Sequence, residues 1–341
     1  MVHSLSMIKG LVIRSFLSFF FVVCWLVVPP YGFAHEEYGD RSHDPGFLHI
    51  RPQAPPHNFR MTLPHLLPGS IKPGAGYILG TTFTNVWVYD KDINLDYEML
   101  DLHMSFTYGL SEDFGFALVY DQRNFYGGIL DGLVQGIHEI FGIDQNGRTD
   151  VPKGRTYLEQ FDTGTIIDDM TVLDNRAINF MIQYVFIHGR NNLPAVGLTG
   201  GVRYTLEAPE GGTEKHPVDT TIALGLAKRL AQDWYTCLHL GLTRFEQTKI
   251  LHLEFKKEIY TGMWALAWDV SHRTSLLAQI FHTEGTIENF AQFSHPSTEL
   301  NLGVRLVTDA GGAFEFAIIE NIFNYNNSPD LGFHFAYSGM F

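Results

Sequence analysis

Cysteine is scarce in this sequence: among 341 residues there are two, Cys24 and Cys237. Cys24 lies in an apolar N-terminal stretch that we expect to be removed from the mature chain. One remaining thiol cannot form an intramolecular disulfide, which excludes a disulfide-stabilised scaffold. An exported protein of this size must therefore be stabilised in another way.

The chain is also poor in charge, above all in basic residues. Charged residues make up 18% of the sequence, and 23 Lys and Arg face 37 Asp and Glu, which gives a formal net charge of -14. Affinity for nucleic-acid phosphates comes from clustered Lys and Arg, and no basic run occurs. We therefore expect no nucleic-acid partner.

Long apolar runs are absent except at the N-terminus, where residues 17–28 read LSFFFVVCWLVV. Lys9 and Arg14 precede this run, and small residues follow at the positions that a signal peptidase reads, up to Ala34. The run is shorter than the roughly 20 residues that a membrane-spanning helix needs. We predict a signal peptide over residues 1–34 that is cleaved after export; an uncleaved membrane anchor is the alternative.

Glycine and aromatic residues, in contrast, are abundant, with 33 Gly, 27 Phe and 14% aromatic residues in all. This composition is typical of a chain rich in strands and turns. Large apolar residues alternate with polar or small ones along many segments, as in TELNLGVRLV, where Leu300, Leu302, Val304 and Leu306 share one face. Such alternation predicts strands with one apolar face.

Alternation of this kind predicts twelve strands, most of them longer than the usual strand of about 5 to 6 residues. All are long enough for a tilted strand to cross a hydrocarbon layer, which takes about 9 to 11 residues. The predicted strands cover residues 77–90, 97–110, 113–126, 175–188, 195–207, 217–230, 233–246, 258–270, 274–285, 296–308, 313–324 and 330–341.

The connections between these strands alternate in length. Tight turns are expected near residues 111, 191, 231, 272 and 310, whereas the other connections are longer and the one over residues 127–174 is the longest. A soluble sandwich also shows alternation, but short turns at one end, long loops at the other and an even strand number are typical of an outer-membrane barrel. We predict an antiparallel transmembrane β-barrel over residues 77–341, with short periplasmic turns and long extracellular loops.

The chain ends on LGFHFAYSGMF, with an aromatic residue at its last position. Phe333, Phe335 and Tyr337 alternate with small or polar residues, and Phe341 closes the series. This pattern resembles the signal by which the barrel assembly machinery recognises outer-membrane barrels. The alternative is an ordinary amphipathic strand that happens to end in Phe.

The longest connection contains a helical pattern near residues 128–142, since Leu130, Leu133, Val134 and Ile137 recur at helical spacing. We predict an amphipathic helix there. It either folds into the lumen as a constriction or lies across the outer loops without a gating role.

Three stretches resemble one known family: GGILDGLVQGIHEIFGIDQNGR, LHLEFKK and ENIFNYNNSPDLGFHFAYSGMF. They are similar to an uncharacterised proteobacterial family of outer-membrane barrel proteins, known as a domain of unknown function. The stretch LHIRPQAPPHNFRMTLP resembles the N-terminal segment of that family less closely. The resemblance covers roughly residues 47–341 and implies the barrel fold, but it implies no activity.

An enzyme is not expected. Outer-membrane lipid hydrolases activate a serine through a neighbouring histidine near the lipid boundary, but no His-x-Ser-Asn-Gly run occurs. The pairs Ser271-His272 and Ser294-His295 lack a recognisable acidic or oxyanion partner. A lipid hydrolase is the less favoured alternative.

A metal site is not expected either, and no cofactor is implied. The segment before the first strand, residues 35–76, carries His35, His43, His49, His57 and His65. Imidazole binds zinc, copper and nickel, but these spacings lack the close pairs that preorganise a site. The segment is interpreted as a periplasmic lead-in or as a plug inside the lumen.

Charged residues recur on the inner register of the predicted strands. In a barrel of about twelve strands they either line a narrow aqueous passage and select small solutes, or pair with one another and close the lumen. The residues expected to face the lumen are Asp101, His103, Asp121, Arg123, Arg203, Glu207, Arg229, His239, Asp269, Glu299, Arg305 and Glu315.

The sequence therefore favours a monomeric protein of the bacterial outer membrane that acts as a passive channel or transporter for a small solute. Its expected partners are outer-membrane lipid, the barrel assembly machinery and that solute. The alternative is a closed barrel that acts as a structural or interaction protein at the cell surface.

Overall fold

The computed structural model describes residues 47–341, apart from residues 61, 63, 69, 129, 142–152, 162–163, 190–192, 291, 310, 322–326 and 328. The expected signal peptide and two of the histidines of the segment before the barrel, His35 and His43, lie outside the described residues. Within the described part of the chain, no helix is long and apolar enough to cross a membrane.

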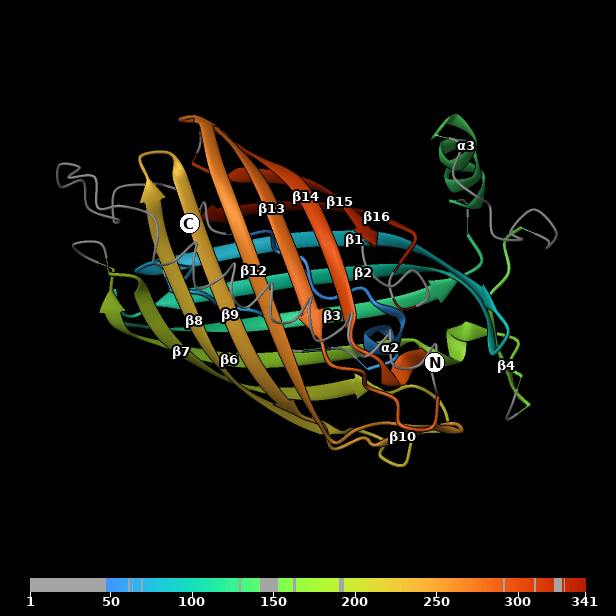
Figure 1. Cartoon of the computed structure of the whole chain (residues 1–341). Helices are drawn as coiled ribbons and strands as arrows, with labels where there is room; N and C mark the ends of the chain where they lie inside the picture. The colour runs from blue at the N-terminus through green and yellow to red at the C-terminus, as the bar shows by residue number, and fades with distance from the viewer. Residues whose placement is uncertain are drawn as a thin grey trace, which may run out of the picture. The chain divides into compact units, whose positions relative to one another are not determined.

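Twelve long strands form one closed antiparallel sheet (Figure 1). Each of these strands pairs with the next one along the chain, and β1 pairs with both β2 and β16, so the ring of twelve strands is closed. This confirms the predicted twelve-stranded barrel. Its strands are β1 (Gly74–Asp90), β2 (Ile93–Gly109), β3 (Phe114–Tyr126), β6 (Asn175–His188), β7 (Ala195–Glu207), β8 (Val218–Ala231), β9 (Trp234–Arg244), β12 (Glu258–Ser271), β13 (Thr274–Thr283), β14 (Ser297–Val307), β15 (Ala313–Asn321) and β16 (Leu331–Met340).

The two ends of the barrel differ. At one end, called the turn end, short turns join β2 to β3, β6 to β7, β8 to β9, β12 to β13 and β14 to β15, and β16 ends there. The other end, called the loop end, carries the longer connections. These contain helix α3 (Asp131–Phe141), the 3-10 helices η2 (Met170–Leu173) and η3 (Gln292–Ser294), and the short strands β4 (Tyr157–Gln160), β5 (Thr165–Ile167), β10 (Lys249–Ile250) and β11 (Leu253–Glu254). Helix α3 confirms the helix expected near residues 128–142.

One connection differs from the prediction. The join between the first two strands was expected among the longer loops, but β1 and β2 continue to a two-residue turn at Lys91 and Asp92. The parts of β1 and β2 nearest the loop end stay paired with each other up to this turn, and β4 pairs with the other edge of β2 there. Ile93 and Leu95 on this extension are fully buried.

The outer face of the wall is apolar. On β6, Phe180, Ile182, Tyr184 and Phe186 point outward and are about half exposed, whereas the alternating residues, such as Asn179, are buried inside. Aromatic rings also line the outside near the turn end, where Trp234 and Trp268 stack with their centroids 5.5 Å apart. Tyr77 likewise packs against the last residue of the chain, with a centroid distance of 5.0 Å.

The loop end is covered by an apolar cluster, called here the cap cluster. The β1–β2 extension, the connections between β3 and β6, β9 and β12, and β13 and β14 all contribute to it. Its buried members are Phe59, Val86, Val88, Ile93, Leu95, Tyr97, Met99, Phe125, Leu158, Ile167, Met170, Leu173, Ile250, Leu253, Phe255, Ile287, Phe290 and Phe293.

Residues 47–72, called here the plug segment, lie inside the ring of strands. Every described residue from Ile50 to Pro68 is buried. The segment begins near the turn end, reaches the loop end with the short helix α2 (Pro55–Asn58), and returns to the turn end before β1 starts (Figure 1). Phe59, just after α2, packs into the cap cluster, with its ring 6.2 Å from that of Phe293.

Candidate functional site

The candidate site is the inner face of the wall together with the plug segment that fills it. Its central contact is made by Arg123 on β3, whose side chain is fully buried. One guanidinium nitrogen donates to the carbonyl oxygen of His57 at 2.8 Å and to the side-chain oxygen of Asn58 at 3.0 Å. The other donates to the carbonyl oxygen of Pro52 at 3.2 Å and to Asp101 at 2.9 Å. A single wall residue therefore holds both flanks of helix α2.

Glu299 on β14 makes the second contact with the tip of the plug segment. Its two carboxylate oxygens accept hydrogen bonds from the backbone N–H groups of Gln53 and Ala54, each at 2.8 Å. These two N–H groups precede helix α2, which begins at Pro55 and Pro56, and so they take no part in its hydrogen bonds. Two hydrogen bonds to consecutive backbone groups fix both the position and the direction of the chain, so Glu299 holds the plug segment just before α2.

The base of the plug segment is held by a buried ion pair near the turn end. Arg305 on β14 donates to Glu315 on β15 at 2.6 Å, and it also bonds the carbonyl oxygen of Phe47. Glu315 accepts from the backbone N–H of His49 at 3.1 Å and contacts its ring Nδ1 at 2.7 Å. Wall charges thus pair with each other and with the plug backbone at the same time.

Two arginines of the plug segment extend these contacts. Arg51 forms a buried ion pair with Asp121 on β3. Arg60 donates to the carbonyl oxygens of Gln247 at 2.8 Å and Lys256 at 2.7 Å, in the connection between β9 and β12. The guanidinium of Arg60 also lies 3.7 Å from the ring centre of Phe245, within the range of a cation–π contact.

Histidines meet across the plug and the wall. The Nδ1 atom of His65 lies 3.1 Å from Nδ1 of His239 on β9. The His65 ring also stacks on Phe281, with 5.2 Å between ring centres. Because a hydrogen bond between two Nδ1 atoms needs one donor and one acceptor, at least one of the two imidazoles is neutral in this arrangement.

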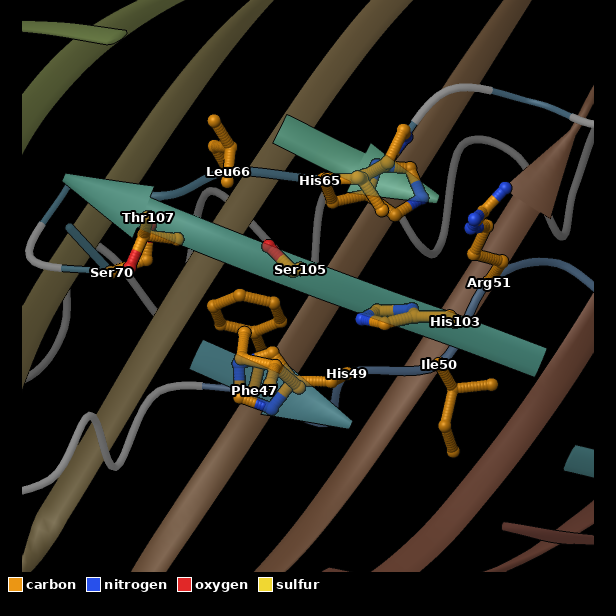
Figure 2. Close-up of a pocket in the computed structure, with 13 residues that line it drawn as sticks. Phe47, His49, Ile50, Arg51, His65, Leu66, Ser70, His103, Ser105 and Thr107 are labelled. Atoms are coloured by element: carbon orange, nitrogen blue, oxygen red, sulfur yellow. The ribbon is translucent and has the colours of Figure 1, made fainter. Parts of the chain in front are cut away.

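A small cavity remains between the two legs of the plug segment and β1–β3. Its volume is about 30 Å³, which is enough for about one or two water molecules. Arg51 from the first leg, His65 from the second and His103 from β2 lie around it (Figure 2). This cavity is too small for a solute larger than water.

The structure places the twelve residues expected in the lumen in several different surroundings. Seven bond directly to the plug segment: Asp101, Asp121, Arg123, His239, Glu299, Arg305 and Glu315. His103 lines the cavity, and Arg203 forms a buried ion pair with Asp219 on β8.

Three of the twelve lie away from the plug contacts just described. Asp269 accepts from Ser275 at 2.6 Å, and Arg229 bonds the carbonyl oxygens of the β8–β9 turn, Ala231 and Gln232. Glu207 is half exposed and pairs with Arg176 at 3.1 Å. It does not line the plugged lumen, because β7 ends at that residue and its side chain reaches the rim.

Gln279 on β13 also holds the plug segment, although it is neither charged nor a His and so was not among the residues expected in the lumen. This side chain accepts from the backbone N–H of Leu48 at 2.9 Å and donates to its carbonyl oxygen at 3.4 Å. Alternation could have predicted that Gln279 faces the lumen, because Leu276 and Ala278 lie on the opposite, outward face of β13.

Comparisons with known proteins give a family but no activity. The family model described as "Protein of unknown function (DUF3187)" matches residues 23–341, which confirms the resemblance to an uncharacterised family. A comparison with curated proteins finds no significant match.

Several solved structures are similar to this chain at low identity. The COG4313 outer membrane channel from Pseudomonas putida F1 is 13% identical, with a TM-score of 0.49 over 81% of this chain and 100% of that one. The KdgM porin in complex with disordered oligogalacturonate is 7% identical, with a TM-score of 0.42 over 77% and 99%. The toluene transporter TodX of P. putida is 10% identical, with a TM-score of 0.40 over 79% and 90%. At such identities and TM-scores these likenesses carry no argument about function.

Proposed function

The chain belongs to the DUF3187 family, whose description assigns no activity, and we propose from the geometry of the lumen that it is an outer-membrane channel for a small solute. In the conformation described here the plug segment closes the channel. The turn end faces the periplasm and the loop end faces the cell exterior.

The outer face supports the membrane location. A closed barrel leaves no unpaired sheet edge, which lipid requires. Outward residues such as Phe180 and Ile182 form an apolar band, and aromatic rings lie near the turn end. We also propose that Phe333, Phe335, Tyr337 and Phe341 form the signal for the barrel assembly machinery, since they line the outer face of the last strand or end the chain.

The proposal rests mainly on the way in which wall residues hold the plug segment. Arg123 and Glu299 bind backbone groups of the plug through hydrogen bonds, and no covalent link joins the described part of the plug to the wall except the chain itself at β1. Burying charged side chains is costly, and apolar residues of similar volume often fill a core as well or better. A lumen built only to be filled would not need these charges, whereas a lumen that opens to water does.

A barrel of this strand number could conduct once the plug moves. About eight strands give an interior that side chains fill, and sixteen or more leave a wide aqueous channel. Twelve strands stand between these limits and accommodate here a segment of two extended legs. Displacement of that segment would leave a passage suited to small solutes.

A second candidate is a permanently closed barrel with a structural or interaction role at the surface. The cap cluster favours it, because Phe59 ties the tip of the plug segment to the loops through contacts with Tyr97, Phe125 and Phe293. In that case the plug is part of the core and never leaves. We expect no enzymatic activity in either case.

Single-channel conductance in a planar bilayer separates the two candidates. The refolded chain from His35 onward would be compared with a form that lacks residues 35–72 and with the same chain from His35 onward that carries Glu299→Gln. The matched control is Glu207→Gln, which removes a carboxylate charge at the rim, away from the plug contacts. A channel predicts more open time for the deletion and for Glu299→Gln but not for the control. Folded variants that all remain silent would support the closed barrel instead.

A further inference from the structure

The inner wall carries an apolar strip as well as charges. Inward residues of β8, β9, β12 and β13 that are small or flexible form this strip, and all are buried: Ala227, Cys237, Met263, Ala265, Ala267 and Leu277. They belong to one cluster with Phe47, Leu48, Ile50 and Leu67 of the plug segment. The strip therefore accommodates the apolar side of the plug.

One charged part of the wall, on β2 and β3, lies across the lumen from this strip. Five strands separate β2 from β12 around the ring in either direction, and five likewise separate β3 from β13. Asp101 on β2 and both Asp121 and Arg123 on β3 therefore face the strip across the passage. An extended object in the lumen meets an apolar surface on one side and ionised groups on the other.

The plug segment is complementary to both sides. Ile50 belongs to the cluster of the strip, while the next residue, Arg51, pairs with Asp121. The fit on the strip is close, because a β-carbon at Gly225 on β8 would lie 3.2 Å from the Cδ2 atom of Leu67. The plug thus presents a cation beside an apolar group.

The charge balance gives the sign of the solute. Among the described residues of the barrel strands, eight buried carboxylates face three buried arginines. Residues 47–72 contain no Asp or Glu but carry Arg51, Arg60 and Lys72. When the plug segment leaves, it takes these cations with it, and the wall that remains is acidic.

We infer that the solute is an amphipathic cation: a small molecule with an amine or guanidinium group for Asp101 and Asp121 and an aliphatic or aromatic body for the strip. This inference rests on the proposed channel function. The solute takes the place that Ile50 and Arg51 occupy when the plug is closed.

Cys237 provides a direct readout, because it is the single thiol of the predicted mature chain and lies in the strip. A thiol reagent would be applied to the refolded mature chain without residues 35–72 and to the refolded chain from His35 onward that carries Glu299→Gln. The labelling rate would be measured with four probes: 2-phenylethylamine, 3-phenylpropionate, 2-phenylethanol and ethylamine. They separate the cation from the anion, from the neutral alcohol and from the cation without an apolar body.

We expect 2-phenylethylamine to slow the labelling of Cys237 at a concentration about tenfold lower than the anion or ethylamine, since it alone satisfies both the charge contact and the apolar contact. Asp121→Asn should reduce its advantage over 2-phenylethanol. Uptake of the same probes into vesicles that contain the protein should follow the same order.

The results distinguish the inference from the function on which it rests. Conductance without any preference for 2-phenylethylamine, or a preference for the anion, would overturn the solute class and leave the channel intact. Folded variants that neither conduct nor expose Cys237 would overturn the channel and the inference together.

Discussion

The outer and inner faces of the barrel wall come from the same strands, but different interactions stabilise them. On the outside, residues such as Phe180 and Ile182 need only an apolar surrounding, and many apolar residues would serve equally well. On the inside, Arg123 has four acceptors at fixed positions, in Pro52, His57, Asn58 and Asp101. The outer face is therefore stable with many different apolar residues, whereas the contacts of the inner face need one particular residue at each position.

The largest expected effect follows from Arg123→Ala. The change removes the contacts with both flanks of α2 and leaves the carboxylate of Asp101 without this partner, and breaking a buried pair from one side costs about 3–5 kcal/mol. We expect the plug to detach, so that Cys237 reacts rapidly with a thiol reagent. Arg123→Lys keeps the charge but not the fork of donors and should give an intermediate rate. Slow labelling of a folded Arg123→Ala protein would contradict the role of this contact.

A charge placed on the outer face tests whether that face contacts lipid. Phe180→Arg places a cation in the middle of β6, where it faces lipid, and should lower the free energy of unfolding in vesicles by about 2–4 kcal/mol. Phe180→Leu keeps the class of the residue and should change that free energy by less than about 1.5 kcal/mol. Denaturant unfolding measures both. Equal effects of Arg and Leu would mean that this face does not contact lipid.

Acidification should weaken the plug through the pair of His65 and His239. Their Nδ1 atoms are 3.1 Å apart, and Arg51 lies in the same plug segment and adds a like charge nearby. Below the ordinary imidazole pKa of about 6.5 a released His65 binds a proton, whereas the closed pair must keep one ring neutral. Closure is therefore favoured above that pH and loses stability as the pH falls through it.

The labelling rate of Cys237, normalised to the form without residues 35–72 at the same pH, measures this effect. The rate should rise between about pH 7.5 and about pH 5.5, across the ordinary imidazole pKa, and His239→Gln should reduce the rise. A pH profile that is unchanged in His239→Gln would show that this pair is not responsible.

The smallest effect is expected at the rim. Arg176 and Glu207 are each about half exposed and their ion pair is 3.1 Å long, so water screens the interaction. Glu207→Gln should change the free energy of unfolding by less than about 1 kcal/mol and leave the labelling of Cys237 unchanged. A large change in labelling would mean that the rim contributes to closure after all.

The sequence predicted the wall of the barrel because the wall follows a local pattern. Alternation with a period of two marks each strand wherever one face meets an apolar medium, and this holds along β6 and β14. The predicted strand began at residue 97 and missed the start of β2, where Asp92, Asn94 and Asp96 are typical of a loop. Ile93 and Leu95 are nevertheless buried in the cap cluster, which extends the strand.

The plug contacts could not be predicted in the same way because they join distant parts of the chain through backbone groups. Glu299 accepts from the N–H groups of Gln53 and Ala54, about 245 residues away along the chain. Any residue except proline offers such an N–H group, so no side-chain pattern in the plug segment identifies the partner. Alternation can place Asp101 and Arg123 on inner registers, but it contains no information about what they bind.

If the plug segment closes a passage that can open, Arg123→Ala should conduct, and a bulky thiol reagent that reacts with Cys237 should reduce its current. We expect steady current before labelling and a single-step decrease afterwards, since Cys237 lies on the wall of the passage. Current that is unaffected by complete labelling, or no current from a folded protein with a reactive Cys237, would contradict this expectation.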